Sequence, residues 1–483
     1  MKPRKKSLGK NAFLNGFKNV LNLLFPLLTF PYVSKVLNVV GIGQYNFAQS
    51  AVSYFSLIAG LGISAYAIRE GAKYRENKKE FNIFASEVLV CNVISTIIAY
   101  LLLALCMVFV DKLKAYAALI WVFSIQIVFT TIGIEWIYSI YEEYEYITIR
   151  SIAFKIVSIV MIFLFVRNSS DTINYAAITV FASVGSNVLN LVHSRDYFQI
   201  VKVHIKDCAK HLKPILVIFA SNIAIMIYVY SDTTMLGFMQ TDYEVGIYSV
   251  SVKIYNIVKN LLSSVLIVSI PRLSMYYGSG KILEFRNTAQ KVYDSITALV
   301  LPAVIGLLCV SKQIVVVISG EAYISAFSSL RILCVALLFC IYGWFFSQCI
   351  LMPAKKERTI LVATCVSAAV NIGLNFCLIP IWKENAAAFT TFVAELIMFV
   401  ICVIYGLKTA RIELLNKNML GVLVGCAGIV CACKVVLFVK CSAVLQLMGA
   451  ITVSGMVYGL VLIIFRNDIV CTVLRKVCLT HEK

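Results

Sequence analysis

Apolar residues form a series of runs, each long enough to cross a membrane as a helix, from one end of the chain to the other. A membrane helix needs about 20 predominantly apolar residues. We identify fourteen such runs, at about 11–37, 43–68, 81–110, 114–140, 149–167, 172–198, 213–239, 243–271, 287–318, 325–352, 357–381, 386–408, 417–438 and 442–465. Because the polar links between them are short, the pattern predicts an all-α polytopic membrane protein with about 14 transmembrane helices and no separate soluble domain.

The composition agrees with this prediction. Of the 483 residues, 60% are hydrophobic and only 14% are charged, and the mean hydropathy is +0.88, outside the range of soluble domains. Most of the sixteen cysteines lie inside apolar runs, there is no CxxC motif, and the one close pair, Cys431 and Cys433, has no His or carboxylate neighbours. We therefore expect them to pack as small hydrophobic residues, and we expect no metal site.

The basic residues carry a topology signal. A net charge of +19 in a soluble protein would suggest nucleic acid, but here Lys and Arg are concentrated on alternate links, as the positive-inside rule predicts. Both termini should then be cytoplasmic, and lipid head groups rather than nucleic acid are the expected contacts. The first run is expected to be a membrane helix, not a removed signal peptide. His204 and His211 share a basic link, where we expect both to be solvated.

The segment 214–272 contains charges inside two apolar runs: Asp232 in the first run, and Lys253 and Lys259 in the second. Each ionised side chain costs about 3 kcal/mol at the bilayer centre, so a charge-lined cavity is expected. At 1.5 Å per residue, Asp232 and Lys253 lie at similar depth and can pair, whereas Lys259 is about 9 Å deeper. We expect Lys253 to be held by Asp232 and Lys259 to be the freer substrate contact. Pairing of Lys259 with Glu395 is the alternative.

Polar residues also mark other runs. Asn11, Asn15, Lys18 and Asn22 form a stripe along the first run, which either joins neighbouring helices or lines a cavity. Glu135 near the end of the fourth run faces either the lumen or the interface. Glu395 is an acid in the middle of the twelfth run.

The second half of the chain repeats part of the first. Gly43 to Tyr45 match Gly246 to Tyr248, and position 43 differs from position 246 by an offset of 203. The same offset aligns Ser50 with Lys253, Ser53 with Asn256 and Ser56 with Lys259. Transporters are often built from such repeats, with the substrate site between them. We predict two six-helix lobes around a central cavity, 1–200 and 201–410, followed by two further transmembrane helices and a cytoplasmic tail over 411–483.

Several stretches together resemble one family. They are Pro31 to Gly43 leading into Tyr45 to Ala48, Arg69 to Arg75, Trp136 to Arg150, Asp232 to Gly237 followed by Gly246 to Tyr248, and Asn375 to Pro380 followed by Ala386 to Ala388. In order and spacing they resemble the polysaccharide flippases of the multidrug, oligosaccharidyl-lipid and polysaccharide exporter superfamily, over nearly the whole chain.

The resemblance implies export of an undecaprenyl-pyrophosphate-linked oligosaccharide across a bacterial cytoplasmic membrane, by alternating access around a largely cationic cavity. A pyrophosphate needs fixed cations or hydrogen-bond donors to replace its water. The candidate substrate-binding residues are Lys259, Lys253, Lys18, Asn15, Asn22, Asn256 and Asn260. Asp232, Glu135 and Glu395 are candidates for a structural or coupling role, with Na⁺ or H⁺ as the coupling ion and no other cofactor. Membrane lipids, a polysaccharide polymerase and glycosyltransferases are the expected partners.

Two other functions fit the sequence less well. An ion-coupled multidrug exporter of the same superfamily would favour cationic drugs and an acidic cavity, whereas the charges within these runs lean basic. A membrane glycan polymerase would need a sizeable outer loop with catalytic groups, and the outer links are short. Since no phosphate-binding Gly-rich loop or nucleophile motif is apparent either, we predict a transporter rather than an enzyme.

Overall fold

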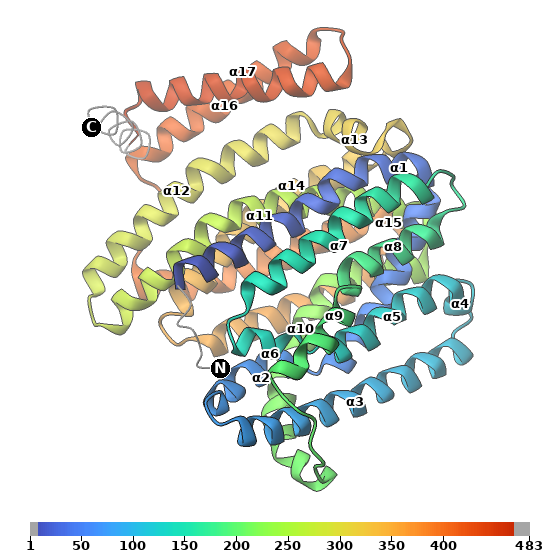
Figure 1. The fold of residues 1–483 in the computed structure, drawn as a ribbon. Helices are drawn as coiled ribbons and strands as arrows, with labels where there is room; N and C mark the ends of the chain where they lie inside the picture. The colour runs from blue at the N-terminus through green and yellow to red at the C-terminus, as the bar shows by residue number, and fades with distance from the viewer. Residues whose placement is uncertain (1–7, 468–483) are drawn as a thin grey trace. The chain divides into compact units, whose positions relative to one another are not determined.

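The computed structural model describes residues 8–467, with side chains for 25–416 and 418–467. Within these residues every regular element is a helix, and no strand occurs. The chain divides into two compact units, Met1–Gly246 and Ile247–Lys483, and the ribbon of each unit is built from long helices (Figure 1). The predicted all-α class is confirmed, whereas the division at residues 200 and 410 stays a prediction.

The first unit holds α1 (Leu8–Gly60), α2 (Ile63–Gly71), η1 (Ala72–Tyr74), α3 (Lys78–Phe109), α4 (Asp111–Lys114), α5 (Ala117–Gly133), α6 (Glu135–Ile140), α7 (Tyr144–Phe165), α8 (Thr172–Val184), α9 (Asn187–His193), η2 (Ser194–Asp196) and α10 (Ile205–Met239). Helix α11 (Asp242–Gly278) crosses the boundary between the units. The second unit continues with α12 (Ile282–Cys309), α13 (Ser311–Ser319), η3 (Glu321–Tyr323), α14 (Ala326–Trp344), the π-helix η4 (Phe345–Leu351), α15 (Glu357–Ala410), α16 (Lys417–Phe438) and α17 (Ala443–Ile464).

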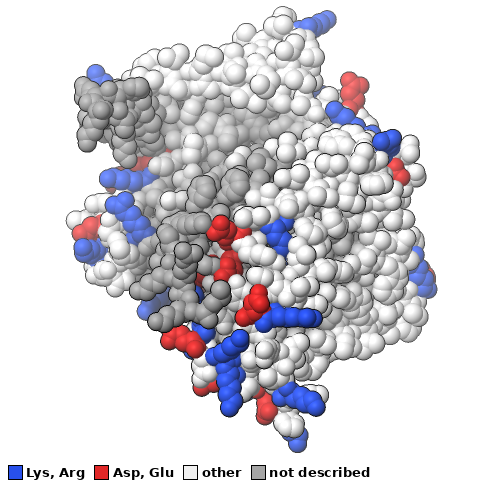
Figure 2. All heavy atoms as spheres, in the orientation of Figure 1, with Lys and Arg blue, Asp and Glu red and all other residues white. Residues whose placement is uncertain are grey.

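Eleven helical segments among the described residues are long and apolar enough to cross a membrane. Two of them contain a break in the helical backbone, at Asn38 in α1 (φ 52°) and at Lys383 in α15 (φ 54°). Both breaks fall inside predicted links between runs. If each broken segment counts as two spans and the shorter apolar α5 is added, the structure is compatible with the predicted fourteen. Broad uncharged areas on the face shown in Figure 2 are typical of a surface in contact with lipid.

Helices α1 and α11 pack against each other through two glycines that the internal repeat aligns, Gly43 of α1 and Gly246 of α11. A Cβ atom on Gly43 would lie 1.8 Å from the carbonyl oxygen of Asp242, and one on Gly246 would lie 2.1 Å from that of Val39. The Gln44 amide donates a hydrogen bond of 3.2 Å to the Asp242 carboxylate. Because only glycine lets the two backbones approach this closely, α1 and α11 meet here through their main chains.

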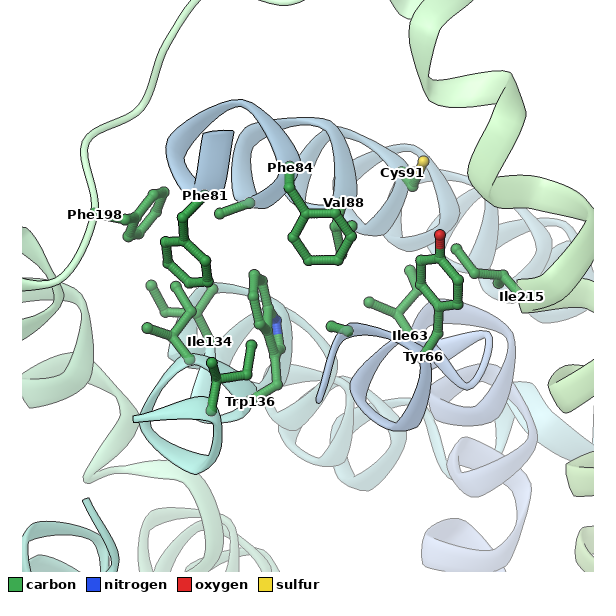
Figure 3. Packing of buried hydrophobic residues seen from close by; sticks show 14 of the residues in the cluster. Ile63, Tyr66, Phe81, Phe84, Val88, Cys91, Ile134, Trp136, Phe198 and Ile215 are labelled. Atoms are coloured by element: carbon green, nitrogen blue, oxygen red, sulfur yellow. The ribbon is translucent and has the colours of Figure 1, made fainter. Parts of the chain in front are cut away.

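A cluster of aromatic and aliphatic residues joins α2 to α3, α6 and α10 (Figure 3). Phe81, Phe84 and Val88 project from α3 toward Trp136 of α6, and all four are buried. Helix association inside a membrane depends on such close packing more than on removal of apolar surface from water. Each of the short helices α2 and α6 follows a break in the helical backbone, and the cluster holds both helices in place.

The two C-terminal helices α16 and α17 pack against each other and against α12. Apolar residues of the three helices form the contact, and Cys426 and Cys433 are buried within it as small hydrophobic side chains. The Tyr458 hydroxyl of α17 donates a hydrogen bond of 2.7 Å to the carbonyl oxygen of Ala298 on α12. This bond ties the terminal hairpin to the rest of the second unit.

Candidate functional site

Helix α11 carries a polar arc along one side. At 3.6 residues per turn, Lys253, Asn256, Lys259 and Asn260 fall within about 120° of the helix circumference. The two amide side chains are exposed and the two lysines are half-buried. Two of the predicted cations therefore lie next to two neutral hydrogen-bonding groups on one membrane-spanning helix.

Lys259 meets an acid from another helix of the second unit. Its Nζ atom lies 3.8 Å from Oε1 of Glu395 on α15, and it lies 5.5 Å from the centre of the Tyr255 ring. The Tyr255 hydroxyl donates a hydrogen bond of 3.3 Å to the same carboxylate, and the buried thiol of Cys340 on α14 interacts with both charges. The structure thus has the alternative geometry of an acid-paired Lys259. Contact of Lys259 with substrate stays a prediction.

The two partners of this ion pair differ in exposure. Only 6% of the Glu395 side chain is exposed, compared with 34% of the Lys259 side chain. The acid is therefore fixed in the protein, while the ammonium is open on one side. A cation–π contact with Tyr255 supports the ammonium from a second direction. Such an arrangement can hold Lys259 in place and still present it to an anionic ligand.

Other predicted site residues lie on α10 and α1. Asp232 on α10 is buried, with 6% of its surface exposed. Its pairing with Lys253, a residue of the other unit, stays a prediction, as does the central cavity between two lobes. Asn15, Lys18 and Asn22 lie on α1, but their side chains are outside the described residues.

Glu135 lines a cavity of about 140 Å³ inside the first unit. The other polar side chains of the lining include Ser56, Ser64, Asn92, Thr130 and Asn187. Glu135 itself begins α6 and follows a backbone break at Ile134 (φ 37°). The structure thus places Glu135 against a cavity within the unit, whereas the sequence left it between the lumen and the interface.

The sequence analysis missed a buried network that joins α2, α3 and α10. His211 lies 2.6 Å from the Tyr66 hydroxyl through Nδ1 and 2.8 Å from Glu87 through Nε2. Lys210 donates a further hydrogen bond of 2.8 Å to Glu87. The prediction that His211 is solvated is therefore wrong, because 5% of the residue is exposed. Glu87 could have indicated this network, because it is an acid within an apolar run and a buried carboxylate requires a partner.

A second network that the sequence analysis missed links the two halves of α15 in the second unit. The Thr390 hydroxyl donates a hydrogen bond of 2.6 Å to Asn375, and the Asn375 amide donates one of 3.2 Å to Asn371. At most 1% of each residue is exposed. The network therefore holds the two helical segments on either side of Lys383 together.

Comparison with known proteins agrees with this architecture. Residues 8–277 match the family described as polysaccharide biosynthesis protein. A candidate O-antigen transporter of Escherichia coli (strain K12) is 25% identical over 276 residues, which are 57% of this chain and 66% of that protein. The corresponding protein of Shigella dysenteriae is 24% identical over 274 residues, which are 56% of this chain and 68% of that protein. The matched segment thus spans about two thirds of the length of these relatives.

Solved structures show the fold. The lipid II flippase MurJ, in an inward closed conformation, superposes with a TM-score of 0.76 at 17% identity, over 95% of this chain and 99% of that one. An inward-facing multidrug transporter of the MATE family superposes with a TM-score of 0.59 at 14% identity, over 79% and 93%. Each of these relatives is named as a transporter or a flippase, in agreement with the prediction of a multi-pass membrane transporter. Because the family match covers more than half of the chain, this protein belongs to the polysaccharide biosynthesis protein family.

Proposed function

We propose that this protein is a flippase that moves an undecaprenyl-pyrophosphate-linked oligosaccharide from the cytoplasmic to the outer leaflet of a bacterial cytoplasmic membrane. The family match, the names of the relatives and the fold shared with a lipid II flippase support a lipid-linked glycan as substrate. Transport would follow alternating access of two lobes, with both termini in the cytoplasm. A polysaccharide polymerase and glycosyltransferases would use and supply the substrate.

The polar arc on α11 is the observation that carries the proposal. Lys253 and Lys259 are six residues apart, so their backbone positions differ by about 9 Å along the helix. Two ammonium groups in a membrane span are costly unless they serve a purpose, and charge-assisted hydrogen bonds to phosphate oxygens are a strong use of them. Asn256 and Asn260 lie beside them and offer neutral donors to the same head group.

The ion pair between Lys259 and Glu395 suggests how a phosphate could be bound and released. Without substrate, Glu395 neutralises the ammonium and so limits the cost of keeping it in the membrane. When a pyrophosphate arrives, its oxygens can compete with Glu395 for the exposed side of Lys259. Return of Lys259 to Glu395 would then favour release. Asp232 would hold Lys253 in the same way.

Membrane potential favours this direction of transport. Moving one charge across 100 mV is worth about 2.3 kcal/mol, and with the inside negative an anion is driven outward. We therefore propose that the potential contributes to export, with Na⁺ or H⁺ as an additional coupling ion. An ion-coupled multidrug exporter would share the fold, but the lysines of α11 favour an anionic substrate over cationic drugs.

Identification of the lipid-linked intermediate tests the proposal. Deletion of the gene should cause an undecaprenyl-pyrophosphate-linked oligosaccharide to accumulate on the cytoplasmic leaflet, where mass spectrometry of extracted lipids would identify it. The wild-type gene supplied in trans should remove the accumulated lipid and restore the surface glycan. A deletion strain with unchanged lipid-linked oligosaccharides and raised sensitivity to cationic drugs would contradict the proposal and favour the multidrug exporter.

A further inference from the structure

The cavity beside Glu135 is built where two helices of the first unit are interrupted. Helix α1 ends at Gly60, and the chain turns through Leu61 (φ 44°) and Gly62 (φ 76°) before α2 begins. Helix α5 ends at Gly133, and Ile134 (φ 37°) separates it from Glu135. Interrupted helices occur in transporters at substrate and ion sites, because irregular backbone at membrane depth is tolerated where it lines a cavity.

Amide side chains satisfy the carbonyl groups at these breaks. Asn92 donates a hydrogen bond of 2.9 Å to the carbonyl oxygen of Ala59, and Asn187 donates one of 3.0 Å to that of Phe129. Each NH₂ group uses one of its two N–H bonds on the backbone, so the carbonyl oxygen and the second N–H of each side chain are left for the cavity. Both amides thus maintain the breaks and add acceptors to the lining.

The rest of the lining is also rich in acceptors. Ser56 donates its hydroxyl proton to the carbonyl oxygen of Val52, and Thr130 donates to that of Gln126, so the lone pairs of both hydroxyls are the part that a ligand can use. The Glu135 carboxylate adds two acceptor oxygens. A surface of this kind suits a ligand with several O–H or N–H donors. It disfavours phosphate and carboxylate groups, which are acceptors only.

The volume of the cavity distinguishes between two kinds of ligand that match such a lining, a bare metal cation and a larger uncharged molecule. An oxygen cage for a bare metal cation holds its ligands at about 2.3–2.6 Å from the ion, as for Ca²⁺, which leaves little open volume. The cavity here has about 140 Å³, close to the roughly 150 Å³ of an apolar cavity that binds benzene, so it is far larger than a bare ion needs and matches the ring of a sugar without all of its substituents. Arg150 also interacts electrostatically with Glu135, which weakens the attraction for a cation. Volume and charge both favour a ring-sized, uncharged ligand.

We infer that this cavity binds one pyranose residue of the transported glycan, either a neutral sugar or an N-acetylated one rather than an acidic one. Glu135 accepts hydrogen bonds from sugar hydroxyls, and Trp136, which also lines the cavity, provides an apolar wall beside the ring. The inference rests on the proposed function, since it assigns to the first unit a part in recognition of the same lipid-linked substrate. A site whose polar groups need hydrogen-bonding partners rejects ligands that cannot supply them.

Gly60 offers a way to fill the cavity without disturbing its walls. Gly60 lines the cavity, no atom lies within 4 Å of the Cβ that a substitution would add, and its φ is not positive. Gly60→Leu should therefore fold and occupy the sugar position, and we expect at least a tenfold loss of glycan export at normal protein abundance. Gly459→Leu on α17 is a matched control, because Gly459 also faces open space outside this cavity. It should export within twofold of wild type.

A binding measurement identifies the ligand independently of export. The chain has four tryptophans, and replacement of Trp121, Trp344 and Trp382 by Phe leaves Trp136 as the reporter in purified protein. Methyl glucoside or methyl N-acetylglucosaminide should give a saturable fluorescence change at millimolar concentration. Methyl glucuronide should bind at least tenfold more weakly, and Gly60→Leu should abolish the response.

Four results would overturn the inference: wild-type export by Gly60→Leu, no response to any of the three glycosides, equal binding of the glucuronide, or a response to NaCl in place of the glycosides. Failure of the proposed function would be a separate result. In that case the deletion strain would accumulate no lipid-linked oligosaccharide, whatever the purified protein binds.

Discussion

Ser56 and Lys259 hold matching positions in the two halves of the internal repeat, yet the structure surrounds them with different chemistry. Ser56 lines a cavity of hydroxyl, amide and carboxylate acceptors in the first unit. Lys259 brings an ammonium group to a buried carboxylate in the second unit. The two halves of the repeat therefore both have a helix at this position, and they differ in the side chain that the helix carries. The first region suits a sugar that donates hydrogen bonds, and the second suits a phosphate that accepts them.

This comparison has a consequence for substrate recognition. A lipid-linked oligosaccharide carries both kinds of group, with charge confined to the pyrophosphate and hydroxyl donors spread over the glycan. If each unit reads one of them, the two sites can be altered independently. Substitutions in the second unit should change the response to the head group, and substitutions in the first unit should change the response to the sugar.

The largest expected effect is the loss of the Lys259 charge. Lys259→Ala should reduce glycan export by about 100-fold, because a charge-assisted hydrogen bond to phosphate is worth roughly 1.5–3 kcal/mol and Glu395 would be left buried without its cation. Lys259→Arg should keep at least a third of wild-type export. Surface glycan per unit of membrane-inserted protein is the measurement. Full export by a stably expressed Lys259→Ala would remove Lys259 from the substrate site.

A smaller effect should follow from copying the second site into the first. Ser56→Lys would place an ammonium opposite Glu135 and take up cavity volume, so we expect about a tenfold loss of export. Ser56→Ala is the matched variant, because it removes the hydroxyl acceptor of Ser56 without adding charge or volume, and it should reduce export by less than Ser56→Lys does. Export by Ser56→Lys at the wild-type rate would show that the cavity of the first unit tolerates a cation, which would contradict the difference between the two regions.

The smallest effect should come from Glu395→Gln, which keeps the shape of the side chain and removes its charge. Lys259 would then lack the competing anion, so substrate should bind more tightly and be released more slowly. We expect a three- to fivefold fall in the maximal export rate together with a lower apparent KM, measured in proteoliposomes. A higher apparent KM would mean that Glu395 positions Lys259 for substrate and does not compete with it.

The sequence was sufficient for features that depend on local composition. Apolar runs predicted the helices, and the links between runs predicted the breaks at Asn38 and Lys383. The internal repeat aligned Lys253, Asn256 and Lys259 with three serines at helical spacing, and the three residues lie on one side of α11. Each of these depends on the length and periodicity of one segment.

Features that depend on packing between distant segments were not predictable in the same way. His211 is buried because α10 packs against α2 and α3, and nothing near it in sequence indicates these neighbours. The depth comparison for Lys259 considered only the helix before it, so the sequence named Glu395 of α15 as an alternative partner and could not choose between the two geometries. The cavity beside Glu135 needs breaks at Leu61 and Ile134, and the residues there carry no helix-breaking proline to mark them.

Head-group selectivity in proteoliposomes tests the central claim most directly. Outward movement of undecaprenyl-pyrophosphate and undecaprenyl-monophosphate carrying the same oligosaccharide would be compared for wild type, Lys259→Ala and Gly60→Leu. We predict that wild type prefers the pyrophosphate by at least tenfold, that Lys259→Ala loses this preference, and that Gly60→Leu is slower with both lipids but keeps it. An unchanged preference in Lys259→Ala, or a preference lost in Gly60→Leu, would contradict the assignment of phosphate to the second unit and sugar to the first.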